Sequence, residues 1–446
     1  MRHCMQWEFF KNNILDRIER SLGILLCYMV TWGTVYIITP GQLPGSEGVW
    51  AYGTIALYAS DIVALMFVLV AGRDIISSQK KYGALRWGIP ALVIAVLMIA
   101  TSHFPFLVAM HIARWVIWFA AWWLLISRYE WRRVGVWILA GLVPVFLLAL
   151  AQWGLQEVWA TKLLGIAAHD TVRLGDSVIA TSRGRVLRAY GIFPHPNILG
   201  AWAAAATGIA LSVLVSQKKK TARLGLWATY ILAVASIFVS VSRSAVIAGI
   251  GVLTVTGLYS IGHKAVRSII GAATGIAFVI ALTFGILYPD IISTRTIHAT
   301  DTRLEQRSID ERTASIQDFP RMLRVVMPWG AGLGQSTYAV QQEDARHSAI
   351  RPAYEYQPVH VAPLVAILEL GVLGIWLIVI GGMVIVKRTA SALFEENESR
   401  AILVLYLGSV LIIGSIFDHY FWTIHAGQVL AALCVVGVVA KTKKTR

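Results

Sequence analysis

The sequence has 446 residues, of which 57% are hydrophobic and only 14% are charged. A soluble protein of this length exposes far more charge, so the bilayer must be the solvent for most of the chain. The formal net charge is +15. In a chain this apolar we interpret that excess as basic loops on the inner face of a membrane, not as a surface for nucleic acid.

Long apolar runs recur along the sequence and predict about twelve transmembrane helices. The fold class is therefore an all-α polytopic membrane protein, with residues 1–446 forming a single integral membrane domain. The predicted spans are 21–39, 51–71, 87–102, 105–127, 134–154, 197–216, 224–241, 245–262, 268–288, 361–386, 401–417 and 426–440.

The distribution of basic residues predicts the orientation of these spans. If the N-terminus lies inside, 24 of the 39 lysines and arginines fall in the two termini and the inner connections. The short outer connections around 40–50, 103–104 and 418–425 contain none. Since inner loops carry the excess of Lys and Arg, both termini are expected in the cytoplasm.

Two long segments, 155–196 and 289–360, then fall on the outer side of the membrane. The first could form a short hairpin around S-R-G-R. The second has 72 residues with eight arginines and no lysine. Its residues 301–327 predict one or two helices broken by Pro320 and Pro328, followed by a glycine-rich turn, and we expect it to roof the active site. A guanidinium offers a planar fork that suits phosphate, whereas an ammonium is a point charge.

The stretch R-A-Y-G-I-F-P-H-P-N, residues 188–197, leads into the sixth predicted span. Asn197 stands where it can cap that helix, which is its simplest interpretation. Arg188 and His195 lie at the outer surface, where either could meet a phosphate or a sugar.

Two further arginines stand in settings that suit an anionic ligand. Arg243, in V-S-V-S-R-S-A, lies between two spans joined by almost no loop, so its charge needs an anionic partner, a bound substrate or snorkelling to headgroups. Arg312, in I-D-E-R-T-A-S, could bind a ligand, pair with Asp310 or Glu311, or lie on a solvated face.

His360 is the last polar residue before the apolar run V-A-P-L-V-A-I-L. A histidine at such a boundary is often only interfacial, but outer arginines converging on it favour a general base. The block D-H-Y-F-W-T-I-H, 418–425, adds Asp418 and His419 at the outer mouth. Within the spans, Asp61 and Arg114 lie at similar depth, which predicts a buried ion pair.

Several signatures of other chemistries are missing. The three cysteines avoid the long outer segments, which gives no support for a disulfide framework or a cysteine metal site. The outer segments contain no D-x-D-type acidic pair, H-E-x-x-H or Walker sequence. We therefore expect no metal and no cofactor.

Four segments together resemble the O-antigen ligase/polymerase family of bacterial inner-membrane proteins. They are R-x-x-G-x-F-x-x-P-N at 188–197, S-R-S-A at 242–245, the arginine-bearing helix with G-A-G-L-G-Q-S-T-Y after it, and H-x-x-x-L-x-x-x-x-E-L-G-x-x-G at 360–374. The span number and the position of the long loop, between the ninth and tenth spans, are also similar.

The resemblance implies transfer of a glycan from undecaprenyl pyrophosphate to an acceptor on the periplasmic face of the inner membrane. It implies that Arg243 and Arg312 bind the pyrophosphate and that His360 is catalytic, with Arg188 a weaker member of the group. We expect inversion at the anomeric carbon, and substrate contacts from the residues Arg188, His195, Asn197, Asp418 and His419. The partners would be the lipid-linked glycan donor, membrane lipid and, for a ligase, lipid A–core.

A ligase is the favoured interpretation. A polysaccharide polymerase and a protein O-oligosaccharyltransferase of the same family remain alternatives. A flippase or transporter for lipid-linked sugars is an alternative of another class.

Overall fold

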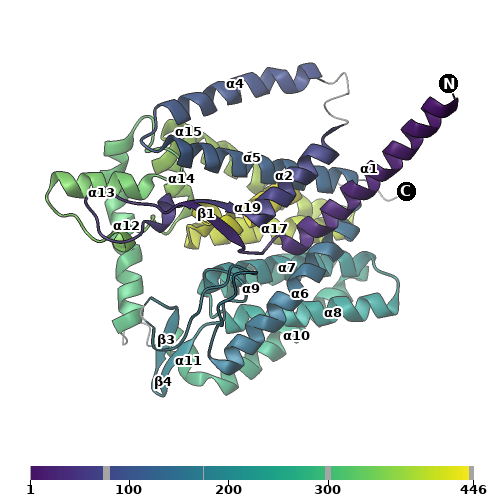
Figure 1. Cartoon of the computed structure of the whole chain (residues 1–446). Helices are drawn as coiled ribbons and strands as arrows, with labels where there is room; N and C mark the ends of the chain where they lie inside the picture. The colour runs from purple at the N-terminus through teal and green to yellow at the C-terminus, as the bar shows by residue number, and fades with distance from the viewer. Residues whose placement is uncertain (1, 74–80, 174, 297–302, 441–446) are drawn as a thin grey trace.

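The structure, a computed structural model, describes residues 2–73, 81–173, 175–296 and 303–440. Its regular secondary structure is helical apart from two small hairpins, as Figure 1 shows. Among the described residues, eight helical segments are long and apolar enough to cross a membrane. They are α5 (Pro105–Arg128), α6 (Trp131–Leu155), α7 (Pro196–Ser216), α8 (Lys220–Val239), α9 (Arg243–Gly262), α10 (Lys264–Leu287), the segment Val372–Phe394 and α17 (Glu398–Phe417).

Four more helices overlap the four predicted spans that these eight segments do not cover. Three contain shorter apolar stretches: α2 (Ala59–Ala71), α4 (Lys81–Ala100) and α19 (His425–Val439). The fourth is α1 (Arg2–Met29). The chain is thus an all-α polytopic membrane protein, as predicted.

The centre of the bundle is α7, whose residues are almost all buried. Its sequence is rich in alanine and glycine, and small residues let neighbouring membrane helices approach closely. A Cβ on Gly208 would lie 2.2 Å from the Tyr406 side chain of α17. The close packing of α7 fixes the end of the helix that carries His195 and Asn197.

The first two predicted spans are wrong in their bounds. The first helix ends at Met29, and residues Val35–Thr39 form strand β1. Strand β2 (Ile55–Tyr58) pairs antiparallel with β1 and precedes α2. The run V-Y-I-I-T is rich in β-branched residues and follows a glycine, which favours a strand over a helix. Helix α2 is therefore about 20 Å long at 1.5 Å per residue, short for a full span.

The predicted span 361–386 is also interrupted. Helix α14 (Ala362–Leu370) ends at Gly371, whose φ is +60°, and the chain continues as α15 (Val372–Trp376), a π-helical turn (Leu377–Gly381) and α16 (Gly382–Ser391). A Cβ on Gly371 would lie 2.1 Å from the Pro328 carbonyl oxygen. The break separates the short helix that follows His360 from the helix that spans.

The long segments 155–196 and 289–360 gather at one end of the bundle (Figure 1). The first contains the predicted hairpin, in which β3 (Val178–Thr181) pairs with β4 (Gly184–Leu187). The second contains α11 (Pro289–Thr296), α12 (Arg303–Val326) and α13 (Ser336–Arg346).

The predicted break of the loop helix at Pro320 is wrong. Helix α12 runs through this proline and ends at Val326, before Pro328. More than four turns of α12 precede Pro320, so the loss of one backbone hydrogen bond at the proline does not end the helix. Residues 301–302 of the predicted helical segment lie outside the described residues.

The predicted ion pair between Asp61 and Arg114 is confirmed. The Arg114 Nε donates to Asp61 Oδ2 at 3.1 Å, and both residues are 6% exposed. Asp61 Oδ1 also accepts from Trp118 Nε1 at 2.8 Å and lies 2.9 Å from His425 Nε2. One carboxylate therefore ties α2 to α5 and α19, because a buried charge needs several partners.

Candidate active site

A cavity of about 1570 Å³ lies at the end of the bundle where the two long segments gather. Its walls come from the β3–β4 hairpin, the starts of α7 and α9, helix α12, the segment 351–360 and the segment 417–424. All eight residues that the sequence singled out line it: Arg188, His195, Asn197, Arg243, Arg312, His360, Asp418 and His419.

His360 stands just before α14, where Pro363 in the first turn and the preceding Pro358 constrain the backbone. It is half-buried, and its Nδ1 has no hydrogen-bond partner within the part of the chain that the structure describes. Burial lowers the pKa of His360 below its ordinary value; Asp418 opposes this shift and Arg312 reinforces it. The imidazole is thus neutral at pH 7 and carries a nitrogen with no protein partner, as a general base requires.

His419 lies beside His360, with ring centroids 5.3 Å apart and an interplanar angle of 74°. Its Nδ1 is 2.7 Å from the Thr423 hydroxyl, within the short helix α18 (Tyr420–Thr423) that His419 precedes. Burial lowers the pKa of His419 to about 4. The neutral imidazole of His419 therefore lines the cavity beside His360. Unlike the Nδ1 of His360, the Nδ1 of His419 has a hydrogen-bond partner, the Thr423 hydroxyl.

The capping interpretation of Asn197 is wrong. His195 caps α7 instead, since its Nδ1 accepts from the Asn197 backbone N–H at 3.1 Å. Helix α7 begins at Pro196, so Asn197 is the second helical residue and stands past the capping position. His195 Nε2 lies 3.1 Å from the Ser177 hydroxyl, and burial lowers the pKa of His195 to about 3. Both of its nitrogens are occupied by protein groups.

The Asn197 side chain is the middle of a buried chain of hydrogen bonds. Its Oδ1 accepts from Arg188 Nη2 at 2.6 Å, and its Nδ2 donates to Asp418 Oδ2 at 2.7 Å. Arg188 is 7% exposed and also donates from Nε to the Ser240 carbonyl at 2.8 Å. Burial raises the pKa of Asp418, but the nearby histidines His419 and His195 and the hydrogen bond from the Asn197 amide lower it by more. The pKa of Asp418 is therefore below its ordinary value, and the carboxylate is charged.

Arg243 is the first residue of α9, directly after a tight connection from α8. Ser242 caps the helix by accepting from the Ala245 N–H at 3.4 Å. Val241, which lines the cavity, has φ +45°, a conformation that is strained for a β-branched residue. The guanidinium of Arg243 therefore stands at the positive end of a helix beside the cavity, where both charges favour an anion.

Arg312 projects from α12 into the same cavity. The carboxylates that could have paired with it are otherwise engaged: Glu311 accepts from Arg307 Nε at 2.7 Å, and Asp310 accepts from Gln306 at 3.1 Å. The buried Nε of Arg312 has no hydrogen-bond partner among the described residues. Among the three interpretations, this arrangement favours ligand binding.

Sequence reasoning missed several residues that line the cavity. Tyr52 comes from the connection before α2, and no local signal marks it. Its hydroxyl donates to Gln357 at 2.8 Å, and its ring meets His419 edge-on. The arginines Arg185, Arg295, Arg307 and Arg351 also line the cavity; the arginine bias of the two long segments was the signal that could have identified them.

Within the described ranges, no group of three or more His, Cys, Asp or Glu side chains could hold a metal ion. The donors around His360 are arginines and neutral histidines, and such a set suits a phosphate. Metal independence remains a prediction.

The fold and the cavity define the class: a polytopic helical membrane protein with an arginine-lined cavity at one end of the bundle. Residues 228–379 match the model of the family described as O-Antigen ligase, so the chain carries a domain of the O-antigen ligase family. The comparison with curated proteins gave no match. The matched segment includes Arg243, Arg312 and His360, and it supports an O-antigen ligase or polymerase function.

Proposed function

We propose that the chain is an inner-membrane O-antigen ligase. It transfers a glycan from undecaprenyl pyrophosphate to lipid A–core on the periplasmic face, without a metal ion. His360 is the general base, and Arg243 and Arg312 bind the pyrophosphate. The segments 155–196 and 289–360 are the periplasmic parts, and 289–360 roofs the site.

One observation carries the proposal. Arg243, Arg312 and His360 come from three separate segments and line one cavity. The His360 Nδ1 and the Arg312 Nε both lack protein partners in the described chain. Arg185 is a third residue of the cavity wall, and its buried Nε also lacks a hydrogen-bond partner among the described residues. Buried polar atoms normally find partners, so this clustering in one wall supports a polar ligand.

The reaction needs one proton acceptor and one anion site. An acceptor hydroxyl oxygen attacks the anomeric carbon of the donor sugar, and His360 takes the hydroxyl proton. The bond between the anomeric carbon and the phosphate oxygen breaks, and undecaprenyl pyrophosphate leaves with the electron pair. Attack opposite the leaving group inverts the anomeric configuration. The glycosyl–pyrophosphate bond is already activated, so no nucleotide is consumed.

The charges around the cavity fit this step. Negative charge grows on the leaving pyrophosphate, where the guanidiniums of Arg243 and Arg312 stabilise it. Positive charge grows on His360, where the Asp418 carboxylate favours the imidazolium. Asp418 is itself held by Asn197, which is in turn held by Arg188. We therefore assign Arg188 and Asn197 to positioning Asp418 rather than to direct contact with the substrate.

Lipopolysaccharide profiling of a strain that lacks the protein tests the function. A ligase is supported by loss of the O-antigen ladder together with accumulation of long lipid-linked polymer. Core carrying a single repeat indicates a polymerase. An unchanged lipopolysaccharide with an under-glycosylated periplasmic protein indicates an O-oligosaccharyltransferase.

A transporter predicts a different result. Loss of a flippase leaves the lipid-linked repeat on the cytoplasmic side, so no periplasmic polymer accumulates. In the described spans, Asp61 and Arg114 are buried and hydrogen-bonded to each other. This pairing argues against a polar transport path through the membrane at these two residues.

A further inference from the structure

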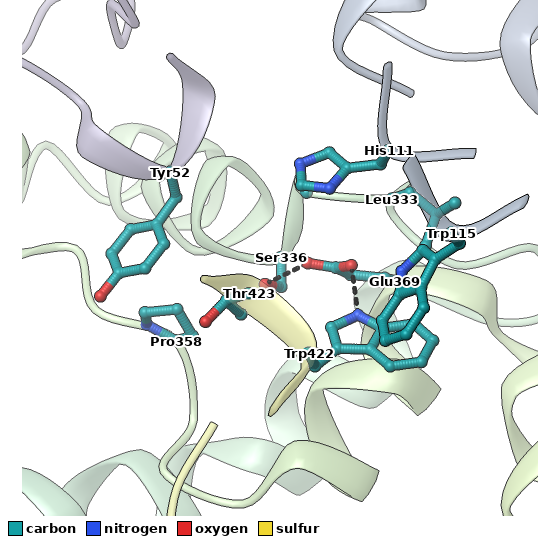
Figure 2. A pocket seen from close by; sticks show the side chains of 10 residues that line it. Tyr52, His111, Trp115, Leu333, Ser336, Pro358, Glu369, Trp422 and Thr423 are labelled. Carbon is teal, nitrogen blue, oxygen red and sulfur yellow. Dashed lines mark hydrogen bonds between the residues drawn. The ribbon is translucent and has the colours of Figure 1, made fainter. Parts of the chain in front are cut away.

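Glu369 is a buried carboxylate beside the cavity, and Figure 2 shows how its neighbours surround it. It is 2% exposed and lies near the end of α14. Its Oε1 accepts from the Ser336 hydroxyl at 2.9 Å, and its Oε2 accepts from Trp422 Nε1 at 2.8 Å. The backbone amides of Gly334 and Ser336 also hydrogen-bond to it.

These donors and the carboxylate that accepts from them belong to three segments far apart in the sequence. Ser336 begins α13, Trp422 lies in α18, and Glu369 lies in α14. The glycine-rich turn before α13 is also docked by its backbone: Ala331 N donates to the Leu368 carbonyl at 2.8 Å, and Gly332 N donates to the Glu369 carbonyl at 2.9 Å. Glu369 is therefore the point at which the three segments are joined.

Two of the joined segments begin with a cavity histidine. His360 precedes Val361, the N-cap of α14, and His419 immediately precedes α18. The Glu369–Trp422 hydrogen bond ties these short helices together, about two and a half turns after His360 and about one turn after His419. His360 and His419 are in edge-to-face contact with no hydrogen bond between their rings in the described chain, so the tie between α14 and α18 supports the relative position of the two rings.

We infer that Glu369 is a positioning residue for His360: by joining α14, α18 and the glycine-rich turn, it fixes the imidazole against His419 and the pyrophosphate-binding arginines. The inference rests on the proposed function, in which His360 is the base. Glu369 lines a small pocket that Tyr52 and His111 also border (Figure 2). It is not among the residues that line the cavity, so we assign it an action through His360 and not on substrate.

Glutamine at this position is an informative perturbation. It keeps the volume but replaces one acceptor oxygen by a donor. The Ser336 hydroxyl can turn to accept from the new amide, whereas the Trp422 N–H and the two backbone N–H groups can only donate. Glu369→Gln therefore loosens the junction without opening a cavity. A misplacement of about 1 Å can reduce a rate by about 10²-fold.

Glu19→Gln is the matched control. Glu19 is another buried glutamate, 4% exposed, which accepts from Arg73, Arg128 and the Tyr129 hydroxyl. Arg128 is the last residue of α5, at the end of that helix opposite to Pro105 and the cavity. The control removes the same charge from an equally buried site that holds no cavity residue.

The experiment compares Glu369→Gln, Glu19→Gln and His360→Ala in purified protein. Transfer is measured in a single turnover, with lipid-linked glycan and acceptor extracted from a strain that lacks the protein. Binding is measured with undecaprenyl pyrophosphate as the probe, and thermal stability is recorded for each variant. We expect Glu369→Gln to transfer about 10- to 100-fold more slowly with unchanged probe binding. The acid limb of its pH–rate profile should shift, because the surroundings of His360 change. Glu19→Gln should lose stability only.

Three outcomes overturn the inference: full transfer by folded Glu369→Gln, loss of probe binding parallel to loss of transfer, or an equal loss of rate in Glu19→Gln. If Glu369→Gln does not accumulate as folded protein, Trp422→Phe carries the test, since it removes one donor and keeps an aromatic ring. It should show the same loss of rate with retained binding, and full activity there overturns the inference. Full transfer by His360→Ala instead overturns the proposed function, and the two failures are thereby distinguished.

Discussion

Replacing His360 by alanine should remove glycan transfer while leaving the binding of undecaprenyl pyrophosphate intact. His360 offers an imidazole that is neutral at pH 7 and contributes little to holding a pyrophosphate. General-base assistance is commonly worth about 10²–10⁴-fold in rate. At about 1.36 kcal/mol for each factor of ten, this corresponds to a barrier about 2.7–5.5 kcal/mol higher.

The arginines should behave in the opposite way. Arg312 carries a buried Nε without a protein partner in the described chain, so its donors are available to the ligand. A hydrogen bond to a charged group contributes about 1.5–3 kcal/mol. Arg312→Ala should therefore weaken probe binding about 10- to 150-fold, at about 1.4 kcal/mol per factor of ten. Lysine at this position should rescue only in part, because it keeps the charge and loses the fork.

The assay measures probe affinity and single-turnover rate for each variant. Arg324→Ala is the matched control, because Arg324 is exposed on the same helix and does not belong to the residues that line the cavity. If His360→Ala loses probe binding while Arg312→Ala retains it, the assignment is reversed and the histidine is a substrate clamp.

The pH dependence gives a second test of the same assignment. Burial holds the pKa of His360 below its ordinary value, so transfer should fall only as the pH drops below about 6.5. Arg312 lowers this pKa and Asp418 raises it. At saturating donor, Arg312→Gln should therefore move the acid limb to higher pH, and Asp418→Asn should move it to lower pH. Shifts in the same direction would show that His360 is not the titrating group.

Three further predictions concern the metal, the buried ion pair and the topology. Purified protein should keep its transfer activity in excess EDTA, and a loss reversed by magnesium or manganese would refute metal independence. Asp61→Ala or Arg114→Ala should destabilise the fold by about 3–5 kcal/mol, and exchanging the two charges should recover part of that loss in a thermal-unfolding assay. If Arg114→Ala abolishes turnover but leaves thermal stability unchanged, Arg114 belongs to the active site instead. Reporter fusions after Ser216 and after Gln341 should report opposite sides of the membrane, and equal signals would reject the orientation.

Much of the architecture was predictable because hydropathy acts through long windows of sequence. Twelve apolar runs correspond to twelve helical segments, and the hairpin around S-R-G-R was marked by its glycine. The boundaries that failed depend on contacts between distant residues. Strand β1 forms where β2 can pair with it, and the break at Gly371 exists because the Pro328 carbonyl approaches its backbone. Hydropathy averaged over a short stretch of sequence does not include either contact, because each joins residues that are distant in the sequence.

The candidate site was predictable for a different reason. Arg243 and His360 interrupt apolar sequence at a boundary, and a charge or an imidazole there demands a partner. Their convergence with Arg312 in one cavity could be expected only through the family resemblance. The exchange of roles between His195 and Asn197 could not be predicted, since both are competent helix caps and the choice depends on Arg188 and Asp418.

Arg188 and Arg312 both line the cavity, but their guanidinium N–H groups differ in whether they have acceptors in the protein. Arg188 is buried and gives its donors to Ser240 and Asn197, so its fork sets the position of Asp418. Arg312 reaches the same cavity from α12, with a buried Nε that no described residue satisfies. A fully bonded guanidinium gains little from binding a ligand, because it must first give up its protein acceptors. The number of arginines alone therefore does not identify a phosphate site. Arg312 and His360 line the same cavity, and each has a buried nitrogen without a hydrogen-bond partner among the described residues, which supports such a site.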